Sequence, residues 1–170
     1  MQIYIPVTLA MLAQLVADGS LRPVNGTAFA VTPRLREAYA EGDDDELGEV
    51  ALQEAALASL RLLAAAADPA EPAAKLPPRR AVLVADIAEV TLRPDLDDAV
   101  VRIAAPVAID DVIAVFVDNA AAEPHVAAAI AVIDEADLGD EDAELTVGDA
   151  QDHDLAWYAT QELPFLLELL

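Results

Sequence analysis

The stretch DELGEVALQEAALASLRLLAAAA, residues 45–67, decides the fold of this chain. It contains no proline and a single glycine, Gly48, and nearly all its other residues favour helix. Its first half carries a polar stripe, whereas the leucines of its second half point to different sides of a helix. A helix of this kind needs cover on most of its faces. We therefore predict a central buried helix over 45–67 that packs on a sheet.

The acidic start of this stretch has two interpretations. Asp43, Asp45, Gly48 and Glu54 match four positions of a calcium-binding loop, but Leu47 occupies a position that needs a polar ligand. Acidic residues are also favourable at the N-terminus of a helix, where they meet the positive end of the helix dipole. We favour the helix N-terminus over the calcium loop.

Patterns on either side of the central helix predict further strands and helices. Runs of β-branched and aromatic residues predict strands at 3–7, 27–31, 81–85, 90–92, 99–104, 113–117 and 155–159, with a short one at 145–147. Helices are predicted at 9–17, 34–40, 120–137 and 161–170, each after a residue of a capping type, Thr8, Thr32, Asn119 and Thr160. Residues 139–144, GDEDAE, read as an acidic loop.

Residues 68–78 are rich in proline and form the one clear linker. The length of the chain fits a single domain, 1–170, within which the linker would join two lobes, 1–67 and 79–170. Strands combined with helices predict an α+β or α/β fold, with a mixed sheet packed by helices. A ferredoxin-like or doubled split βαβ arrangement is the specific prediction.

The charge of the chain is strongly negative and unevenly distributed. The formal net charge is -23, and after Arg102 the sequence has sixteen Asp and Glu residues but no Lys or Arg. Such a surface repels nucleic-acid phosphates and anionic lipids, so we expect neither direct nucleic-acid binding nor membrane binding. A GC-rich genome or a halophilic host would also explain part of this acidity.

Cysteine is absent, which excludes disulfides, thiolate zinc sites and cysteine nucleophiles. The first residues, MQIYIPVT, lack the basic region of a signal peptide. No apolar run approaches the ~20 residues that a membrane-spanning helix needs. These features lead us to expect a cytoplasmic protein.

Three segments carry a resemblance to a known family: Tyr4-Ile5-Pro6-Val7-Thr8-Leu9, Gly26-Thr27-Ala28-Phe29-Ala30-Val31-Thr32-Pro33 and Asp154-Leu155-Ala156-Trp157-Tyr158. On these segments the chain resembles an uncharacterised family of small acidic actinobacterial proteins of unknown function. The resemblance covers most of the chain. It implies a bacterial cytosolic setting and assigns no site residues.

Carboxylates and a histidine adjoin at one place, Asp152-His153-Asp154, which is the candidate metal site. Oxygen and imidazole ligands suit a divalent cation such as manganese, iron or zinc. On an extended strand, however, Asp152 and Asp154 share one face and His153 points to the other. His125 is a candidate distant partner, and a solvated loop is the alternative interpretation. The sequence indicates no other cofactor.

Two pairs of acids, Asp97-Asp98 and Asp110-Asp111, bracket two predicted strands and could meet at one end of the sheet. Paired carboxylates share a proton or bind magnesium, but they also simply solvate the ends of strands. Arg79-Arg80 opens a strand and would bind a carboxylate or phosphate, or pair with the acids nearby. We favour pairing with the acids.

Apolar residues near the C-terminus indicate an interface. Trp157 and Tyr158 are adjacent and face opposite ways on a strand. The large apolar side chains of residues 163–170 cannot all face one way on a short helix, so we expect this tail to pack on the Trp157 strand and the central helix. A surplus apolar face would form a homodimer, with the interface residues Trp157, Tyr158, Phe165, Leu166 and Leu169. Core packing without a partner is the alternative.

Three functions fit these observations. The preferred one is an acidic cytoplasmic binding or regulatory domain that contacts a basic protein partner. The second is a divalent-metal-dependent, hydrolase-like enzyme that uses Asp152, His153 or Asp154. The third is a nucleic-acid mimic, whose carboxylates would have to reproduce the regular spacing of duplex phosphates. Since the sequence contains no catalytic motif, we lean away from an enzyme.

Overall fold

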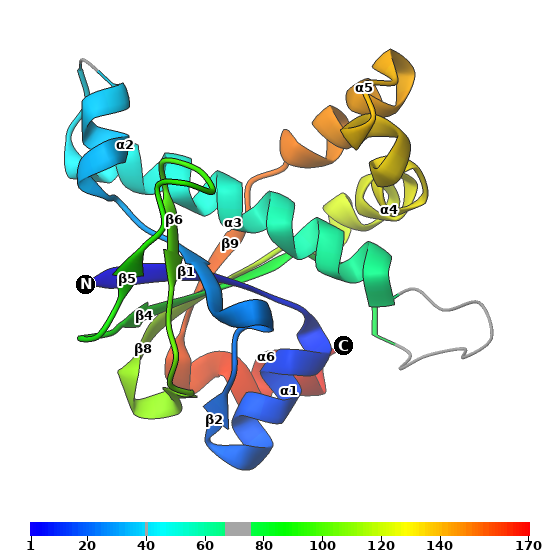
Figure 1. Ribbon diagram of the computed structural model, residues 1–170. Helices are drawn as coiled ribbons and strands as arrows, with labels where there is room; N and C mark the ends of the chain where they lie inside the picture. Colours follow the sequence, from blue (N-terminus) through cyan, green and yellow to red (C-terminus); the bar gives the residue numbers. More distant parts are fainter. Residues whose placement is uncertain (40, 67–75) are drawn as a thin grey trace.

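The computed structural model describes residues 1–39, 41–66 and 76–170. The fold is α+β, as predicted, and is built on a seven-stranded sheet in the order β5-β6-β3-β1-β4-β8-β9 (Figure 1). The strands of this sheet are β1 Gln2–Val7, β3 Thr27–Phe29, β4 Ala81–Asp86, β5 Thr91–Leu92, β6 Val100–Arg102, β8 Val112–Val117 and β9 Ala156–Ala159. The helices are α1 Leu9–Asp18, α2 Pro33–Ala38, α3 Asp44–Ala66, α4 Glu123–Asp137, α5 Glu141–Gln151 and α6 Leu163–Glu168. A two-stranded sheet, β2 Ser20–Leu21 with β7 Val107–Ala108, was not predicted.

Every strand pairing in the described residues is antiparallel. This corrects the mixed sheet. Strands β3 and β4 both run antiparallel to β1, which lies between them, so β3, α3 and β4 form one split βαβ unit. Strand β1, from before the predicted linker, pairs along its length with β4, from after it. Of that linker, residues 68–75 lie outside the described part of the chain.

Helices cover both faces of the large sheet (Figure 1). Alternate residues of β1 point to opposite faces: Ile3, Ile5 and Val7 join a core with α1 and α6, whereas Tyr4 lies on the side of α3. Helices α4 and α5 pack on the C-terminal half of α3 and form a third core with it. The sheet therefore sits between α1 and α6 on one side and α2 and α3 on the other.

The central helix is confirmed, with its described part running from Asp44 to Ala66. Residue 67, its predicted end, lies outside the described residues. Small side chains at Ala51, Ala55 and Ala56 are fully buried, which lets the helix lie close on the sheet. The Ser59 hydroxyl donates to the carbonyl of Val7 and accepts from the amide of Ala81, so it links α3 to β1 and β4. The helix runs through the alternative calcium loop at 43–54.

Local capping signals were largely correct. The Thr8 side chain accepts a hydrogen bond from the Met11 amide at the start of α1, and Gly19 ends that helix with a positive φ of 77°. Thr32 caps α2 in the same way, with Pro33 in its first turn. Asn119 makes no capping bond, and a short 3-10 segment, Ala120–Ala122, precedes α4.

Two predictions near residue 140 were wrong. The acidic loop at 139–144 and the strand at 145–147 are replaced by α5. The Asp140 side chain caps this helix by accepting from the Ala143 amide at 2.9 Å. The acids that follow Asp140 lie in the first turn of the helix, where the dipole favours negative charge. These acids are therefore a helix start rather than a loop.

The C-terminal tail docks on the sheet, but on the face opposite to α3. Helix α6 packs beside α1, with Leu163 and Leu166 buried in the core of that face. The predicted contact between the tail and the central helix is wrong, because the sheet lies between them (Figure 1). The Thr160 hydroxyl donates to the Val112 carbonyl instead of capping the last helix. Across the described ranges, no helix has the length and apolar character needed to cross a membrane.

Candidate functional site

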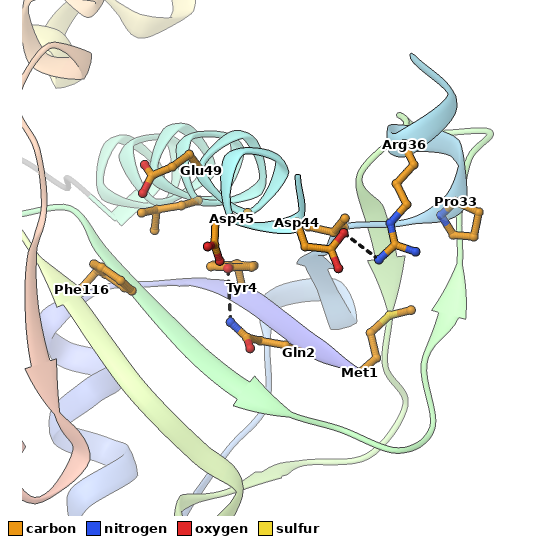
Figure 2. A pocket seen from close by; sticks show the side chains of 12 residues that line it. Met1, Gln2, Tyr4, Pro33, Arg36, Asp44, Asp45, Glu49 and Phe116 are labelled. Carbon is orange, nitrogen blue, oxygen red and sulfur yellow. Dashed lines mark hydrogen bonds and ion pairs between the residues drawn. The ribbon is translucent and has the colours of Figure 1, made fainter. Parts of the chain in front are cut away.

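A pocket of about 660 Å³ lies between the first turns of α3 and the sheet. Figure 2 shows its side chains, which come from β1, the segment around α2, α3 and β8. The lining residues are Met1, Gln2, Tyr4, Val31, Pro33, Arg36, Asp44, Asp45, Gly48, Glu49, Leu52 and Phe116. Four separate parts of the chain thus build this site.

Two aromatic rings form part of the pocket on the sheet side. Tyr4 projects from β1 and Phe116 from β8, and both are half-buried against the core under α3. Gly48 lets α3 pass directly over Tyr4, because a β-carbon at this position would lie 3.0 Å from the Tyr4 hydroxyl. Glycine inside a helix costs about 0.5–1 kcal/mol relative to alanine. The helix bears this cost at the point where it meets the pocket.

The helical wall of the pocket is acidic. Asp44, Asp45 and Glu49 of α3 contribute three carboxylates to the lining. The described lining residues contribute a single guanidinium, that of Arg36. Arg36 pairs with Asp44 at 3.1 Å, as Figure 2 shows, but both side chains are exposed and such a pair contributes little. Within the described residues, Asp45 and Glu49 form no ion pair. The pocket therefore carries excess negative charge.

The titration of Tyr4 reflects this environment. Burial raises the pKa of its hydroxyl, and the nearby carboxylates of Glu49 and Asp45 raise the pKa further. The Gln2 amide donates to the Tyr4 hydroxyl at 3.3 Å, which acts in the opposite direction. The net effect raises the pKa of Tyr4, so its hydroxyl keeps the proton to a higher pH than a free tyrosine does.

Sequence reasoning did not identify this pocket. From the sequence, the acids at 43–45 read as a helix start or, alternatively, as part of a calcium loop, and Tyr4 and Phe116 read as strand residues. One signal was present in the sequence: Gly48 is a glycine inside an otherwise strong helix, and such a residue often marks a close approach of another group. The side chains that meet there are too far apart in sequence for any local pattern to join them.

The candidate metal residues Asp152, His153 and Asp154 lie at the end of α5 and in the turn before β9. The rings of His153 and His125 do approach each other, with centroids 4.8 Å apart. No group of three or more His, Asp and Glu side chains able to hold a metal ion occurs in residues 1–39, 41–66 or 76–170. The structure thus pairs the two histidines but does not assemble a ligand set from the described side chains.

The arginine pair before β4 binds acids, as favoured. Arg79 pairs with Glu123 at 3.1 Å. Arg80 and Asp118 are both fully buried, and two guanidinium nitrogens of Arg80 donate to the Asp118 carboxylate at 2.8 Å. Arg80 also donates to the main-chain carbonyl of His153. This buried pair joins the start of β4, the end of β8 and the turn before β9.

The paired acids do not meet. Asp97 and Asp98 precede β6, whereas Asp110 and Asp111 precede β8, and three strands lie between β6 and β8. Asp98 instead binds α2, because its carbonyl accepts from the Thr32 hydroxyl and its carboxylate pairs with Arg34. The two pairs of acids therefore lie at separate places on the sheet.

The predicted interface residues divide into exposed and buried ones. Trp157, Phe165 and Leu169 are exposed, at 58%, 68% and 85%. Tyr158 is half-buried against the core that contains α1 and α6. Leu166 is buried in that same core, so its side chain is not available to a partner. Trp157 also lies on the opposite face of the sheet from α6, because it is paired across strands with Phe116.

Comparison with known proteins identifies a family without assigning an activity. Residues 1–167 match a family described as a family of unknown function, DUF6912. No curated protein and no solved structure matches the chain. The match spans nearly all of the sequence and includes the strands, helices and pocket described above. The chain therefore belongs to DUF6912, a family of unknown function.

Proposed function

We propose that this protein is an acidic binding domain for a basic protein partner, and that the pocket at α3 receives a lysine or arginine side chain of that partner. The observation that carries the proposal is the combination of aromatic rings and surplus carboxylates in one pocket. A cation over an aromatic face gains about 0.5–2 kcal/mol. Asp45 and Glu49 add charge-assisted hydrogen bonds that a neutral ligand would not form.

The charge of the whole molecule supports the same class of partner. A protein with a net charge of -23 attracts a positively charged surface over long distances and accelerates its association. The attraction weakens as salt screens it. The setting we propose is the cytoplasm, which suits a chain without cysteine. The metal-enzyme and nucleic-acid-mimic hypotheses stay predictions that the pocket does not favour.

The test is an NMR titration with a lysine homopeptide of about six residues, compared in two variants of equal charge. Asp45→Asn/Glu49→Gln changes the pocket, and Asp134→Asn/Glu135→Gln changes exposed acids of α4. Each variant has a net charge of -21, because two of the negative charges that make up -23 are removed. We expect the pocket variant to weaken binding about tenfold, equivalent to roughly 1.4 kcal/mol.

The wild-type titration should also shift the resonances of Tyr4 and Phe116. The α4 variant should bind nearly as well as the wild type, because it leaves the pocket intact. Equal weakening in both variants would show that only overall charge attracts the peptide, and the pocket would then have no role in recognition.

A further inference from the structure

Strand β9 is an open edge of the large sheet. It is the last strand in the sheet order and, among the described residues, β8 is its one partner, through Ala156–Ala159. On its other side no strand or main-chain hydrogen bond from the described residues reaches it. An open edge presents unpaired amide and carbonyl groups that can accept another strand.

An exposed tryptophan stands on this edge. Trp157 is the only tryptophan in the chain, and 58% of it is accessible. Its cross-strand partner is Phe116, which lines the acidic pocket. The two rings therefore extend the aromatic side of the pocket to the edge of the sheet. Helix α3 does not cover this part of the sheet face, since it packs mainly on β1, β3 and β4.

The charge around β9 decides between two kinds of occupant. The acids nearest to it in the chain, Asp152, Asp154 and Glu162, are all exposed. The whole segment after Arg102 lacks Lys and Arg, so a second copy of this chain would bring like charges together. A strand that carries positive side chains would instead be attracted to the same edge.

We propose that β9 accepts an extended segment of a basic protein as an added strand, with a lysine or arginine side chain over Trp157. This inference rests on the basic partner proposed above but uses a different surface. Residues directly opposite each other on neighbouring strands have β-carbons about 4.5–5.5 Å apart, which places a cationic side chain within the ~6 Å range of a cation–π contact. The alternate residues of the added strand would face the side of half-buried Tyr158 and should be apolar.

The probe is therefore a peptide of about eight residues that alternates lysine and valine. One control peptide replaces each valine with proline, which keeps the charge but removes strand-forming amides. A second control replaces each lysine with glutamate. We expect the lysine–valine peptide to slow hydrogen exchange at those amides of Ala156–Ala159 that point away from β8 by about tenfold or more, and the controls to leave them unchanged.

Variants separate the edge from the pocket. Trp157→Leu keeps an apolar side chain but removes the aromatic face, and it should raise the Kd of the lysine–valine peptide about 2- to 30-fold. Leu138→Ala, at a side chain that is 89% exposed on the C-terminal side of α4, should leave the Kd unchanged. NMR amide shifts give these affinities without relying on tryptophan fluorescence.

The other outcomes overturn the inference in distinguishable ways. Strand addition is wrong and the pocket proposal stands under three joint results: the proline peptide binds equally well, β9 stays unprotected, and only the Asp45→Asn/Glu49→Gln variant loses affinity. If no lysine peptide binds at about 50 mM salt, both proposals fail. If β9 is protected without any peptide and sedimentation shows a dimer, the occupant is a second copy of the chain.

Discussion

At the scale of single residues, the buried pair of Arg80 and Asp118 is the most consequential polar contact in the described chain. Both side chains have no accessible surface, and the carboxylate accepts from the Arg80 guanidinium and from the Arg80 amide. A buried ion pair adds little net stability over a well-packed apolar pair. Removing one partner, however, leaves a buried charge without compensation.

We predict that Asp118→Asn lowers the free energy of unfolding by about 3–5 kcal/mol. For a chain of this size that corresponds to a fall in Tm of about 6–20 °C. The matched control is Asp137→Asn, because Asp137 also binds an arginine, Arg61, through two hydrogen bonds but on the surface. For the control, calorimetry should show a change in Tm of no more than about 3 °C. Equal losses in the two variants would contradict the role of burial.

At the scale of elements, α6 is a short apolar helix with one face in the core and the other in solvent. Leu163 is fully buried beside α1, whereas Phe165 is 68% exposed. The tail packs in the core that α1 forms with the sheet, and not on the central helix as expected. The expectation that its surplus face forms a homodimer stays a prediction. The two faces can be tested separately by truncating one side chain on each.

Leu163→Ala should lower the free energy of unfolding by about 2–5 kcal/mol, because it opens a cavity in the core between α6 and the sheet. Phe165→Ala should change it by no more than about 0.5 kcal/mol in a monomer, because the ring faces solvent. Urea unfolding followed by circular dichroism measures both. A large loss for Phe165→Ala, together with a Tm that rises with protein concentration, would show instead that a second copy covers this face.

At the scale of the whole molecule, uncompensated negative charge dominates. The sequence has 32 acids and nine Lys and Arg residues, so the described ion pairs involve only a small share of the carboxylates. Repulsion among the remaining acids destabilises the compact state. Salt screens this repulsion over a Debye length that falls from about 30 Å at 0.01 M to about 3 Å at 1 M.

We predict that Tm rises by about 3 °C or more when sodium chloride is raised from about 0.01 M to about 0.5 M. Screening also weakens the surface ion pairs, but these are few, so the relief of repulsion should be the larger effect. Scanning calorimetry across a salt series measures the shift. A Tm that falls with salt would mean that the ion pairs stabilise the fold more than the excess acids destabilise it.

The sequence by itself determined the elements whose causes are local. Helix α1 follows from its Thr8 cap and Gly19 stop, and α3 follows from a long run of helix formers. The strands follow from β-branched runs. The ion pairs that Arg79 and Arg80 form with acids follow from the surplus of carboxylates. Where two local signals competed, as at 139–147, the cap at Asp140 and the helix-favouring charges decided for α5.

Only the tertiary structure decided what depends on contacts between distant residues. Antiparallel pairing of β1 with β4, the face on which α6 docks and the choice of Asp118 as the partner of Arg80 are set by packing across the whole sheet. The pocket has the same origin, because Tyr4, Gly48 and Phe116 meet only after α3 has crossed the sheet. A local pattern fixes the conformation of a few neighbouring residues, whereas strand order and pocket geometry follow from how the chain buries its apolar faces together.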